Sequence, residues 1–482
     1  MLELALAIAL AVGHLAVVIW VLLTEKRQPT ATLAWLQAIL FLPIVGFLLY
    51  LLIGTTKAKR IAARTTRAHD HVEALVHKYG LREQSTCETE NFEPRQQALL
   101  KLGDRLASMP ATHSNHAEIL VDGRETYASA AASIDTATDH VHVQFYIVQP
   151  DQTGVALRDL LVRKARQGVQ VRVLVDAVGS MSLPADFWKP LEDAGGLAAR
   201  FNPIVRSLNR FRRHERIDFR NHRKIVVVDG RIAFTGGINV GREYLGLDPA
   251  MGNWRDTHAR LTGPAVIGLQ RTFAEDWYAS TDELLDDVRY FPAPEPRHYG
   301  KALVQVIDSG PDRKWSPIEH IYTQAIALSE EAVWITSPYF IPSQSIESAL
   351  VAAALRGVDV RVLVPEKSDS RVVTLASSSW YRDLIEAGVR IFRYQSGFVH
   401  AKTMVVDRWV GTIGSANLDT RSFDLNFELG IFLQDSEFTD QLRAQFEADL
   451  LHAREWTIED ERAVGLGLRI LRALARLMSP LL

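Results

Sequence analysis

Cysteine is almost absent from this chain of 482 residues, because Cys87 is the only one. A single cysteine excludes an internal disulfide, which suits a reducing compartment. The chain also lacks an excess of positive charge, with a formal net charge of -3. General nucleic-acid binders are usually basic, so this balance argues against a nucleic-acid partner. Paired His, Cys and carboxylate residues at metal-ligand spacing are absent too, so we expect no metal and no other cofactor.

Long apolar runs are few. Two of them, Leu2–Leu23 and Ala31–Ile53, lie near the N-terminus. As a helix, each is long enough to cross a bilayer. The first run lacks the basic leader of a signal peptide, and the second follows at once. We therefore expect a transmembrane helical hairpin over residues 1–60, with a buried hairpin of a soluble protein as the alternative. Basic residues follow the second run before any acid, and positive-inside bias then places both termini and the catalytic part in the cytoplasm. These residues are Lys57, Lys59, Arg60, Arg64 and Arg67.

One short pattern occurs twice. The first copy is His222-x-Lys224-x4-Asp229, followed by Gly236-Gly237-x-Asn239. The second copy is His400-x-Lys402-x4-Asp407, followed by Gly414-Ser415-x-Asn417. A single His-x-Lys-x4-Asp string is a weak signal, but two copies with identical offsets are a strong one. Displacement at phosphorus needs one group to attack and another, on the opposite side, to protonate the leaving oxygen. Two histidines supply both groups.

Each copy is predicted to form a β-hairpin. In the first copy β-branched residues precede Asp229-Gly230, which is a strong turn signal, and Asp407-Arg408 takes the same place in the second. Residues i and i+2 of a strand share a face, so each histidine lies beside its lysine. The lysines stabilise charge on the phosphate oxygens, and Asn239 and Asn417 can donate further hydrogen bonds. We interpret the two aspartates as motif members that hold the hairpins rather than as acid or base.

These residues resemble the phospholipase D superfamily, whose signature is this His-Lys-Asp motif with a Gly-Ser-x-Asn continuation. The resemblance implies that both motifs meet at one active site. It further implies that one histidine forms a covalent phospho-histidine while the other acts as an acid and then as a base. Family analogy favours His222 as the nucleophile and His400 as the acid/base, although the sequence itself does not assign them.

The resemblance also implies a carboxylate that orients a histidine through its other ring nitrogen. Glu428, eleven residues after Asn417, matches that family position. The same offset in the first copy falls on Ala250, so Asp256 is the later candidate for the same role. The first copy also has Gly237 where serine is usual. A hydroxyl contact with phosphate is therefore expected from Ser415 and not from the first copy.

Within that superfamily the chain is similar to the bacterial cardiolipin synthases. The similarity is carried by the apolar N-terminal hairpin and by residues 254–258, 273–277, 337–342 and 476–482. It implies a phosphatidyltransferase of the bacterial inner membrane that makes cardiolipin and glycerol from two molecules of phosphatidylglycerol. Phosphatidylglycerol and anionic membrane lipids are then the expected partners.

Four alternatives to this function are considered. They are a phospholipase D hydrolase, transfer to another alcohol, a nucleic-acid phosphodiesterase, and a scaffold that binds lipid without turning it over. The acidic balance and the apolar runs oppose the phosphodiesterase. Two matched histidines oppose the scaffold, because a binder needs the lysines alone.

The repeat extends beyond the motifs. Strand-like residues 141–146 correspond to 333–339, residues 169–175 correspond to 358–364, and helical stretches separate them. This alternation predicts an α/β fold with two tandem α/β/α domains related by a pseudo-twofold. We place a linker or helical segment at 61–115, the first domain at 116–295, the second at 296–460 and a C-terminal amphipathic helix at 461–482.

Two further segments are candidates for lipid contact. Eight basic residues lie between Arg206 and Lys224, either in a solvated loop or as a contact for anionic lipid beside the active site. They are Arg206, Arg210, Arg212, Arg213, Arg216, Arg220, Arg223 and Lys224. The helix expected from Leu466 to Leu477 places its arginines on one face and leucines elsewhere. This helix either lies in the membrane interface or packs on the catalytic core.

Overall fold

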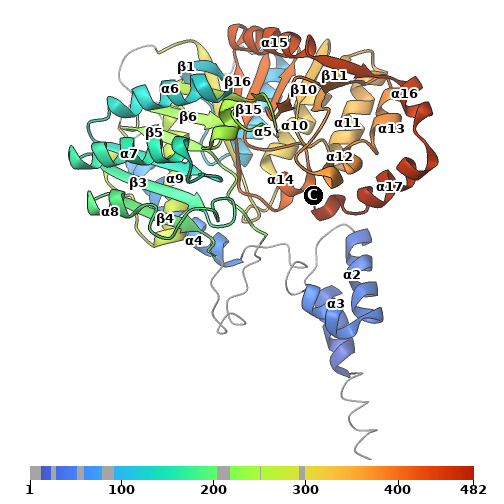
Figure 1. Ribbon diagram of the computed structural model, residues 1–482, viewed down its shortest axis with the longest axis horizontal. Coiled ribbons are helices and arrows are strands. Elements are labelled where there is room, and N and C mark those ends of the chain that lie inside the picture. The colour runs from blue at the N-terminus through green and yellow to red at the C-terminus, as the bar shows by residue number, and fades with distance from the viewer. Residues whose placement is uncertain are drawn as a thin grey trace, which may run out of the picture.

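In the computed structural model, residues 12–22, 29–50, 59–78, 92–203, 218–249, 251–292 and 299–481 are described. Figure 1 shows an α/β body with the N-terminal helices beneath it. The strands of the first half are β1 (Thr112–Val121), β2 (His140–Phe145), β3 (Gln170–Asp176), β4 (Leu197–Phe201), β5 (Ile225–Val228), β6 (Ile232–Gly236) and β8 (Thr257–Thr262). Those of the second half are β9 (Ala302–Ser309), β10 (Ala332–Thr336), β11 (Asp359–Pro365), β12 (Arg390–Tyr394), β14 (Thr403–Val406), β15 (Val410–Gly414), β16 (Glu428–Gln434) and β17 (Ala453–Trp456).

These fifteen strands form one continuous sheet. Outward from the centre, the first half runs β1-β8-β6-β5-β2-β3-β4 and the second runs β9-β16-β15-β14-β10-β11-β12-β17. The two orders match strand for strand, with β17 added at the end. The halves join where β1 pairs antiparallel with β9, so that each covers an edge that the other would leave exposed. The predicted α/β class is confirmed, but the two expected domains share a single sheet, and the boundary at residue 116 falls inside β1.

Local sequence explains the mixed pairing within each half. Strand β2 is buried along its whole length and pairs parallel with β3, as β10 does with β11. The hairpins β5–β6 and β14–β15 are antiparallel, as predicted. Asp229 turns the first hairpin at φ 51° and Asp407 the second at φ 49°, a left-handed conformation that aspartate tolerates.

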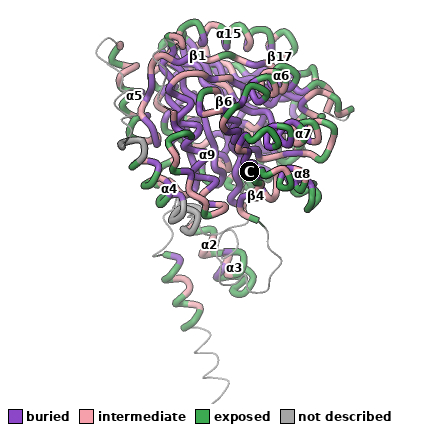
Figure 2. Tube along the Cα trace, turned by 90° about the vertical axis from the view of Figure 1, so that its left-hand side faces the viewer, coloured by how far each residue is buried: buried purple, intermediate pink, exposed green. Residues whose placement is uncertain are grey.

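Helices cover both faces of the sheet. The first half carries α6 (Asp122–Asp135), α7 (Gln152–Arg166) and α8 (Lys189–Asp193) on one face and α9 (Val266–Thr281) on the other. The second half carries α10 (Pro317–Ala327), α11 (Gln344–Leu355), α12 (Arg371–Ser377) and α13 (Tyr381–Glu386) on one face and α15 (Ser436–Leu450) on the other. A single apolar cluster joins Phe273 and Trp277 of α9 with Phe446 of α15, so the core is continuous between the halves. Figure 2 shows this buried interior inside an exposed shell.

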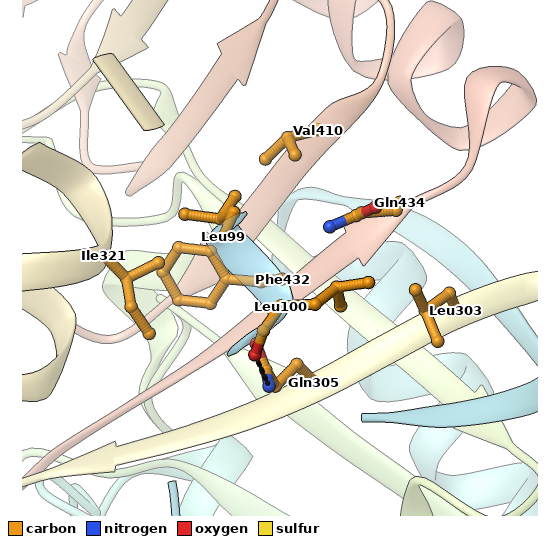
Figure 3. Close-up of a pocket in the computed structure, with 8 residues that line it drawn as sticks. All are labelled: Leu99, Leu100, Leu303, Gln305, Ile321, Val410, Phe432 and Gln434. Carbon is orange, nitrogen blue, oxygen red and sulfur yellow. Dashed lines mark hydrogen bonds between the residues drawn. The ribbon is translucent and has the colours of Figure 1, made fainter. Parts of the chain in front are cut away.

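The segment predicted as a linker or helical segment, 61–115, contains helices that pack on the body. Helix α4 (Lys59–Lys78) packs on α9, where Arg271 and Glu73 form an ion pair of 2.7 Å. Helix α5 (Pro94–Leu106) approaches β9 so closely that a Cβ at Gly103 would overlap the Gln305 side chain. Figure 3 shows the small apolar gap left there, of ≈ 10 Å³, which has room for about one water molecule. This gap is too small to hold a substrate.

The N-terminal helices are residues 12–22, α2 (Pro29–Phe41) and α3 (Pro43–Leu49). They pack together around Tyr50, whose ring centre lies 5.7 Å from that of Trp20 and 5.5 Å from that of Trp35. The second predicted span is divided at Leu42, because Pro43 begins a new helix. None of the helices among the described residues has both the length and the apolar character needed to cross a membrane. Residues 1–11, 23–28 and 51–58, on which the predicted hairpin and its orientation partly depend, lie outside the described residues.

The predicted basic cluster divides into two parts. Its members between Arg206 and Arg216 lie outside the described residues. Arg220, Arg223 and Lys224 are buried. Arg220 contacts Asp176 at 3.3 Å and Arg223 contacts Asp276 at 2.7 Å, so buried carboxylates, rather than lipid, are their partners. The proposed lipid contact is therefore wrong for Arg220 and Arg223.

Candidate active site

Both motif histidines open into one cavity of ≈ 880 Å³. Its wall includes His222 and Asn239 from the first half and His400 and Asn417 from the second. The two histidines thus come together although they are 178 positions apart in the chain. The continuous sheet explains this, because β5 and β14, which follow the histidines, occupy matching places on either side of the β1–β9 junction.

His222 is held by the second half of the chain. Its backbone N–H donates to the carbonyl of Phe427 over 2.9 Å. Its ring Nδ1 lies 3.1 Å from both carboxylate oxygens of Glu428, the next residue. The ring also contacts Tyr146 edge to face, with centres 5.0 Å apart. Two successive residues of the opposite half therefore fix both the backbone and the ring of this histidine.

His400 is held in the same way by the first half. Its N–H donates to the carbonyl of Arg255 over 2.7 Å, and its Nδ1 lies 2.8 Å from Oδ2 of the next residue, Asp256. The short strands β7 (Trp254–Arg255) and β13 (Phe398–Val399) pair just before these contacts and align the two segments. The ring of Trp254 packs 5.1 Å from the His400 ring. Each half therefore orients the histidine of the other.

The sheet register shows that Asp256 and Glu428 are counterparts. Gly236 pairs with His258, and Gly414 pairs with Gly430. The two carboxylates each lie two residues before these partners. Asp256 was the later sequence candidate because the chain between Asn239 and Trp254 is longer in the first half and includes the 3-10 turn η4 (Arg242–Leu245). This longer loop displaces the carboxylate from the expected offset at Ala250.

The usual serine is absent from the first copy for a steric reason. A Cβ at Gly237 would overlap the carboxylate of Asp256. At the matching place Ser415 donates its hydroxyl hydrogen bond to Oε2 of Glu428. Ser415 thus supports the carboxylate, and the cavity wall does not include it. Direct contact of Ser415 with phosphate stays a prediction.

The two lysines are buried beside their histidines. Lys224 Nζ donates to the carbonyl of His222 and Lys402 Nζ to that of His400, both over 2.6 Å. Lys402 Nζ also lies 2.9 and 3.0 Å from the ring nitrogens of His400, whereas Lys224 Nζ lies 5.7 Å from the centre of the Tyr146 ring. Burial lowers the pKa of Lys402 to about 8 and holds the pKa of Lys224 well below its usual value.

Burial also sets the charge of the histidines and their partners. It lowers the pKa of His222 to about 4, and burial together with the Lys402 charge lowers the pKa of His400 to about 4. Burial alone would raise the pKa of Glu428 and of Asp256, but attraction to the histidine and lysine beside each carboxyl outweighs it and lowers both. An ionised carboxylate only accepts hydrogen bonds, so Nδ1 of each neutral ring carries the proton. Nε2 is then left as a nucleophile or base.

The motif aspartates lie away from the cavity. Asp229 accepts hydrogen bonds from the backbone N–H groups of residues 138, 139 and 140, at the start of β2. Asp407 accepts from residues 330, 331 and 332, at the start of β10, and also from Arg95 and Trp409. Each aspartate therefore joins its hairpin turn to the neighbouring strand, which is a structural role.

The asparagines line the cavity but are partly engaged. Asn239 accepts from Ile147 N over 3.1 Å and donates from Nδ2 to the Tyr244 hydroxyl over 2.9 Å. Asn417 donates from Nδ2 to Asp419 over 3.1 Å, and its Oδ1 has no protein partner. Each Nδ2 has two hydrogens, so one remains for an oxygen in the cavity.

Aromatic residues of the cavity wall were not assigned from the sequence. Tyr146 follows β2 directly, Tyr339 lies three residues after β10, and Trp254 lies against His400. Tyr339 donates to Asp369 at 2.7 Å. The repeated strand segments contain both tyrosines, so comparing the ends of those segments would have found them. Asp369 and Arg421, which also line the cavity, carry no such signal.

Comparisons with known proteins identify the family of the chain. Residues 131–276 and 322–450 match a family described as cardiolipin synthase, PLD-like domain, and residues 15–54 match a phospholipase D-nuclease N-terminal family. A cardiolipin synthase of Geobacillus sp. (strain WCH70) is 39% identical over 464 residues, covering 96% of this chain and 91% of the relative. The major cardiolipin synthase of Bacillus subtilis (strain 168) is 38% identical over 479 residues, covering 97% of both chains.

A solved structure supports the fold independently. The phosphatidylserine synthase of Haemophilus influenzae Rd KW20 superposes with a TM-score of 0.60 at 16% identity, covering 80% of this chain and all of that chain (100%). At this identity the likeness concerns the fold alone. The family match and the relatives, taken with the paired motifs in one cavity, show that the chain belongs to the cardiolipin synthase family of phospholipase D-like proteins.

Proposed function

We propose that this protein is a phosphatidyltransferase that converts two molecules of phosphatidylglycerol into cardiolipin and glycerol. One observation carries the proposal. Two neutral imidazoles, each oriented by a carboxylate of the opposite half, line the same cavity with a buried lysine beside each. This arrangement supplies a nucleophile, an acid and two cations around one phosphodiester. The family to which the chain belongs supports the same chemistry.

In the first step Nε2 of His222 attacks the phosphorus of phosphatidylglycerol. His400 donates a proton to the glycerol oxygen as its bond to phosphorus breaks, which gives a phosphatidyl-His222 intermediate and free glycerol. The phosphodiester anion, once bound, raises the pKa of His400 and allows it to take up the proton it needs. Lys224 and Lys402 stabilise the charge that develops on the non-bridging oxygens, with Asn239 and Asn417 as further donors.

In the second step the now neutral His400 removes a proton from the hydroxyl of a second phosphatidylglycerol. That oxygen displaces His222 from phosphorus, which gives cardiolipin and restores both histidines. Glu428 keeps His222 in the tautomer that exposes Nε2, and Asp256 does the same for His400. Since donor and acceptor react in turn at one phosphorus, the kinetics should be ping-pong.

We also propose that the N-terminal helices anchor the protein in the bacterial inner membrane, with the catalytic body in the cytoplasm. Large apolar side chains are exposed over these helices, including Ile19, Leu33, Phe41, Ile44 and Leu48. Exposed apolar surface of this extent on a short helical unit is suited to lipid rather than to water. A lipid substrate gives the anchor its purpose, because phosphatidylglycerol resides in that membrane.

The test is a product assay. Purified full-length protein is incubated with phosphatidylglycerol labelled in the glycerol headgroup and in the acyl chains, in the presence of a chelator. The proposal requires cardiolipin and free glycerol in equal amounts. Phosphatidic acid as the main lipid product would instead identify a hydrolase, and transfer to an added alcohol in preference to phosphatidylglycerol would identify a different acceptor.

A further inference from the structure

The C-terminal helix α17 (Leu466–Arg476) is amphipathic, but its apolar face is turned away from the body. Its buried residues are Arg472 and Ala475. Its large apolar side chains are exposed: Leu466, Leu468, Ile470, Leu471, Leu474 and, just beyond, Leu477. Water disfavours such an arrangement, because leucines on a soluble helix normally face the core. The polar face is the one that the body holds.

Specific contacts fix this orientation. Arg472 forms an ion pair of 2.9 Å with Glu461, which lies in the preceding helix α16 (Ile458–Ala463). The guanidinium of Arg476 lies 4.5 Å from the ring centre of Trp380, which precedes α13. Because the arginines are occupied by partners in the body, rotating α17 to bury its leucines would break both contacts. The outward apolar face is therefore a stable feature of the fold.

The position of the helix relates this face to the active site. Helix α17 packs on α12, which contributes Val373 to the cavity wall. The final turn η6 (Ser479–Leu481) packs on α14 (Thr420–Asp424), which contributes Arg421 to the same wall. In Figure 1, α17 and the C-terminus lie on the side of the body that faces α2 and α3. Both apolar regions therefore lie on one side of the molecule, and α17 packs on a helix of the cavity wall.

We propose that the exposed face of α17 docks into the surface of a phospholipid bilayer and presents the cavity to its substrate. This inference rests on the proposed lipid substrate. Leucines of an interfacial helix enter the boundary between headgroups and acyl chains, while arginines at its margin, such as the exposed Arg469, meet anionic headgroups. A phospholipid that moves from the bilayer into the cavity then stays close to apolar surface.

The first experiment uses the full chain reconstituted in phosphatidylglycerol vesicles and does not depend on catalysis. A polarity-sensitive fluorophore is attached at Leu474→Cys in a Cys87→Ser background, and a matched probe is placed at Leu451→Cys. Leu451 is 85% exposed at the end of α15, which lies across the body from α2 and α3 in Figure 1. The probe on α17 should be quenched by spin-labelled lipid and protected from iodide, and the Leu451 probe should show the reverse. Quenching by iodide at both positions, or protection of the α17 probe from both quenchers, would overturn the proposal.

The second experiment measures catalysis with Leu471→Glu/Leu474→Glu and with Leu451→Glu as the control. The α17 variant should lose at least about tenfold in kcat/KM for phosphatidylglycerol in vesicles, because charge opposes insertion. Its rate with monomeric dihexanoyl phosphatidylglycerol should equal that of the unchanged chain. Unaltered rates in vesicles, or equal losses with both substrates, would contradict the docking role. Absence of transfer by the unchanged chain would instead refute the proposed function, while the quenching result would still decide docking.

Discussion

The two halves of the molecule reach the same geometry with different residues. In the second half a longer carboxylate, Glu428, is supported by the hydroxyl of Ser415. In the first half a shorter one, Asp256, occupies space that only Gly237 leaves free. Each carboxylate then accepts a hydrogen bond from the histidine of the other half. Both halves therefore place a carboxylate at the same position beside a histidine, but different residues hold that carboxylate in place.

The halves also differ in how the lysine meets its histidine. Lys402 Nζ lies within 3.0 Å of both ring nitrogens of His400, whereas Lys224 Nζ lies against the Tyr146 ring. A cation against an imidazole competes for its lone pair, which suits a residue that passes a proton more than one that attacks phosphorus. This difference favours His222 as the nucleophile and makes the halves chemically unequal.

Removal of either histidine should have the largest effect. His222→Ala and His400→Ala should each lower kcat by about 10³-fold or more, because each step of the proposed reaction needs both rings. The measurement is cardiolipin formation in vesicles, with His452→Ala, an exposed histidine, as the control. Substantial turnover by both single variants would show that the two motifs do not form one site.

The same variants can separate the roles of the two histidines. A phosphatidyl ester of p-nitrophenol has a leaving group that needs no proton. His400→Ala should therefore still release p-nitrophenol in a burst, and a labelled phosphatidyl group should stay bound to the protein. His222→Ala should do neither. The reverse pattern would assign the nucleophile to the second half.

Gly237 and Ser415 test the supports of the two carboxylates. Gly237→Ala places a methyl group where the Asp256 carboxylate lies and should lower kcat by about 10–100-fold, as expected when the group that orients a histidine is displaced. Ser415→Ala removes one hydrogen bond to Glu428 and should cost only about threefold to tenfold, near 1 kcal/mol. The pair is measured by kcat with KM determined separately. Equal losses would mean that the added methyl group does not displace the Asp256 carboxylate.

Much of the site could be predicted from sequence because its parts are local. The hairpins, their turns and the side-by-side histidine and lysine follow from spacing within each motif. The family resemblance supplied Glu428 at the family's offset, and Asp256 only as a later candidate, because the longer loop around η4 intervenes. Pairing of each histidine with the carboxylate of the other half depends on contacts between distant segments, such as Phe427 with His222, which no local pattern encodes.

The fold shows the same division. Strand–helix alternation predicted each half, but joining into one sheet depends on edge pairing of β1 with β9. Runs of charged residues in the sequence were the least reliable predictor of lipid contact. Arg220 and Arg223 belong to a basic run in the sequence, yet they are buried against Asp176 and Asp276. For α17 the spacing of arginines and leucines predicted an arginine face and a leucine face. It did not predict that the arginine face packs on the body.

The pH dependence of kcat/KM tests the electrostatic difference between the halves. In the free enzyme His222 must be neutral to attack phosphorus, and its pKa of about 4 places an acid limb there, with activity lost as pH falls. Lys402 must be charged, so its pKa of about 8 places an alkaline limb there, with activity lost as pH rises. Lys402→Arg, whose side chain stays charged, should move the alkaline limb upward even if the maximal rate falls. An unmoved limb would assign it to another group.

The two motif aspartates should show the smallest effect, and on stability rather than on catalysis. Asparagine tolerates the left-handed turn, so Asp229→Asn and Asp407→Asn keep the hairpins but turn one accepting oxygen into a donor that faces backbone N–H groups. Asp407 is buried and also binds Arg95 and Trp409, whereas Asp229 is partly exposed. Asp407→Asn should therefore cost about 2–3 kcal/mol of unfolding free energy, and Asp229→Asn about 1 kcal/mol.

Denaturant unfolding in detergent micelles measures both free energies. The kcat of the folded fraction should stay within about twofold of the unchanged chain, since neither carboxylate lines the cavity. A loss of kcat comparable to that of the histidine variants would instead place the aspartates in the chemistry.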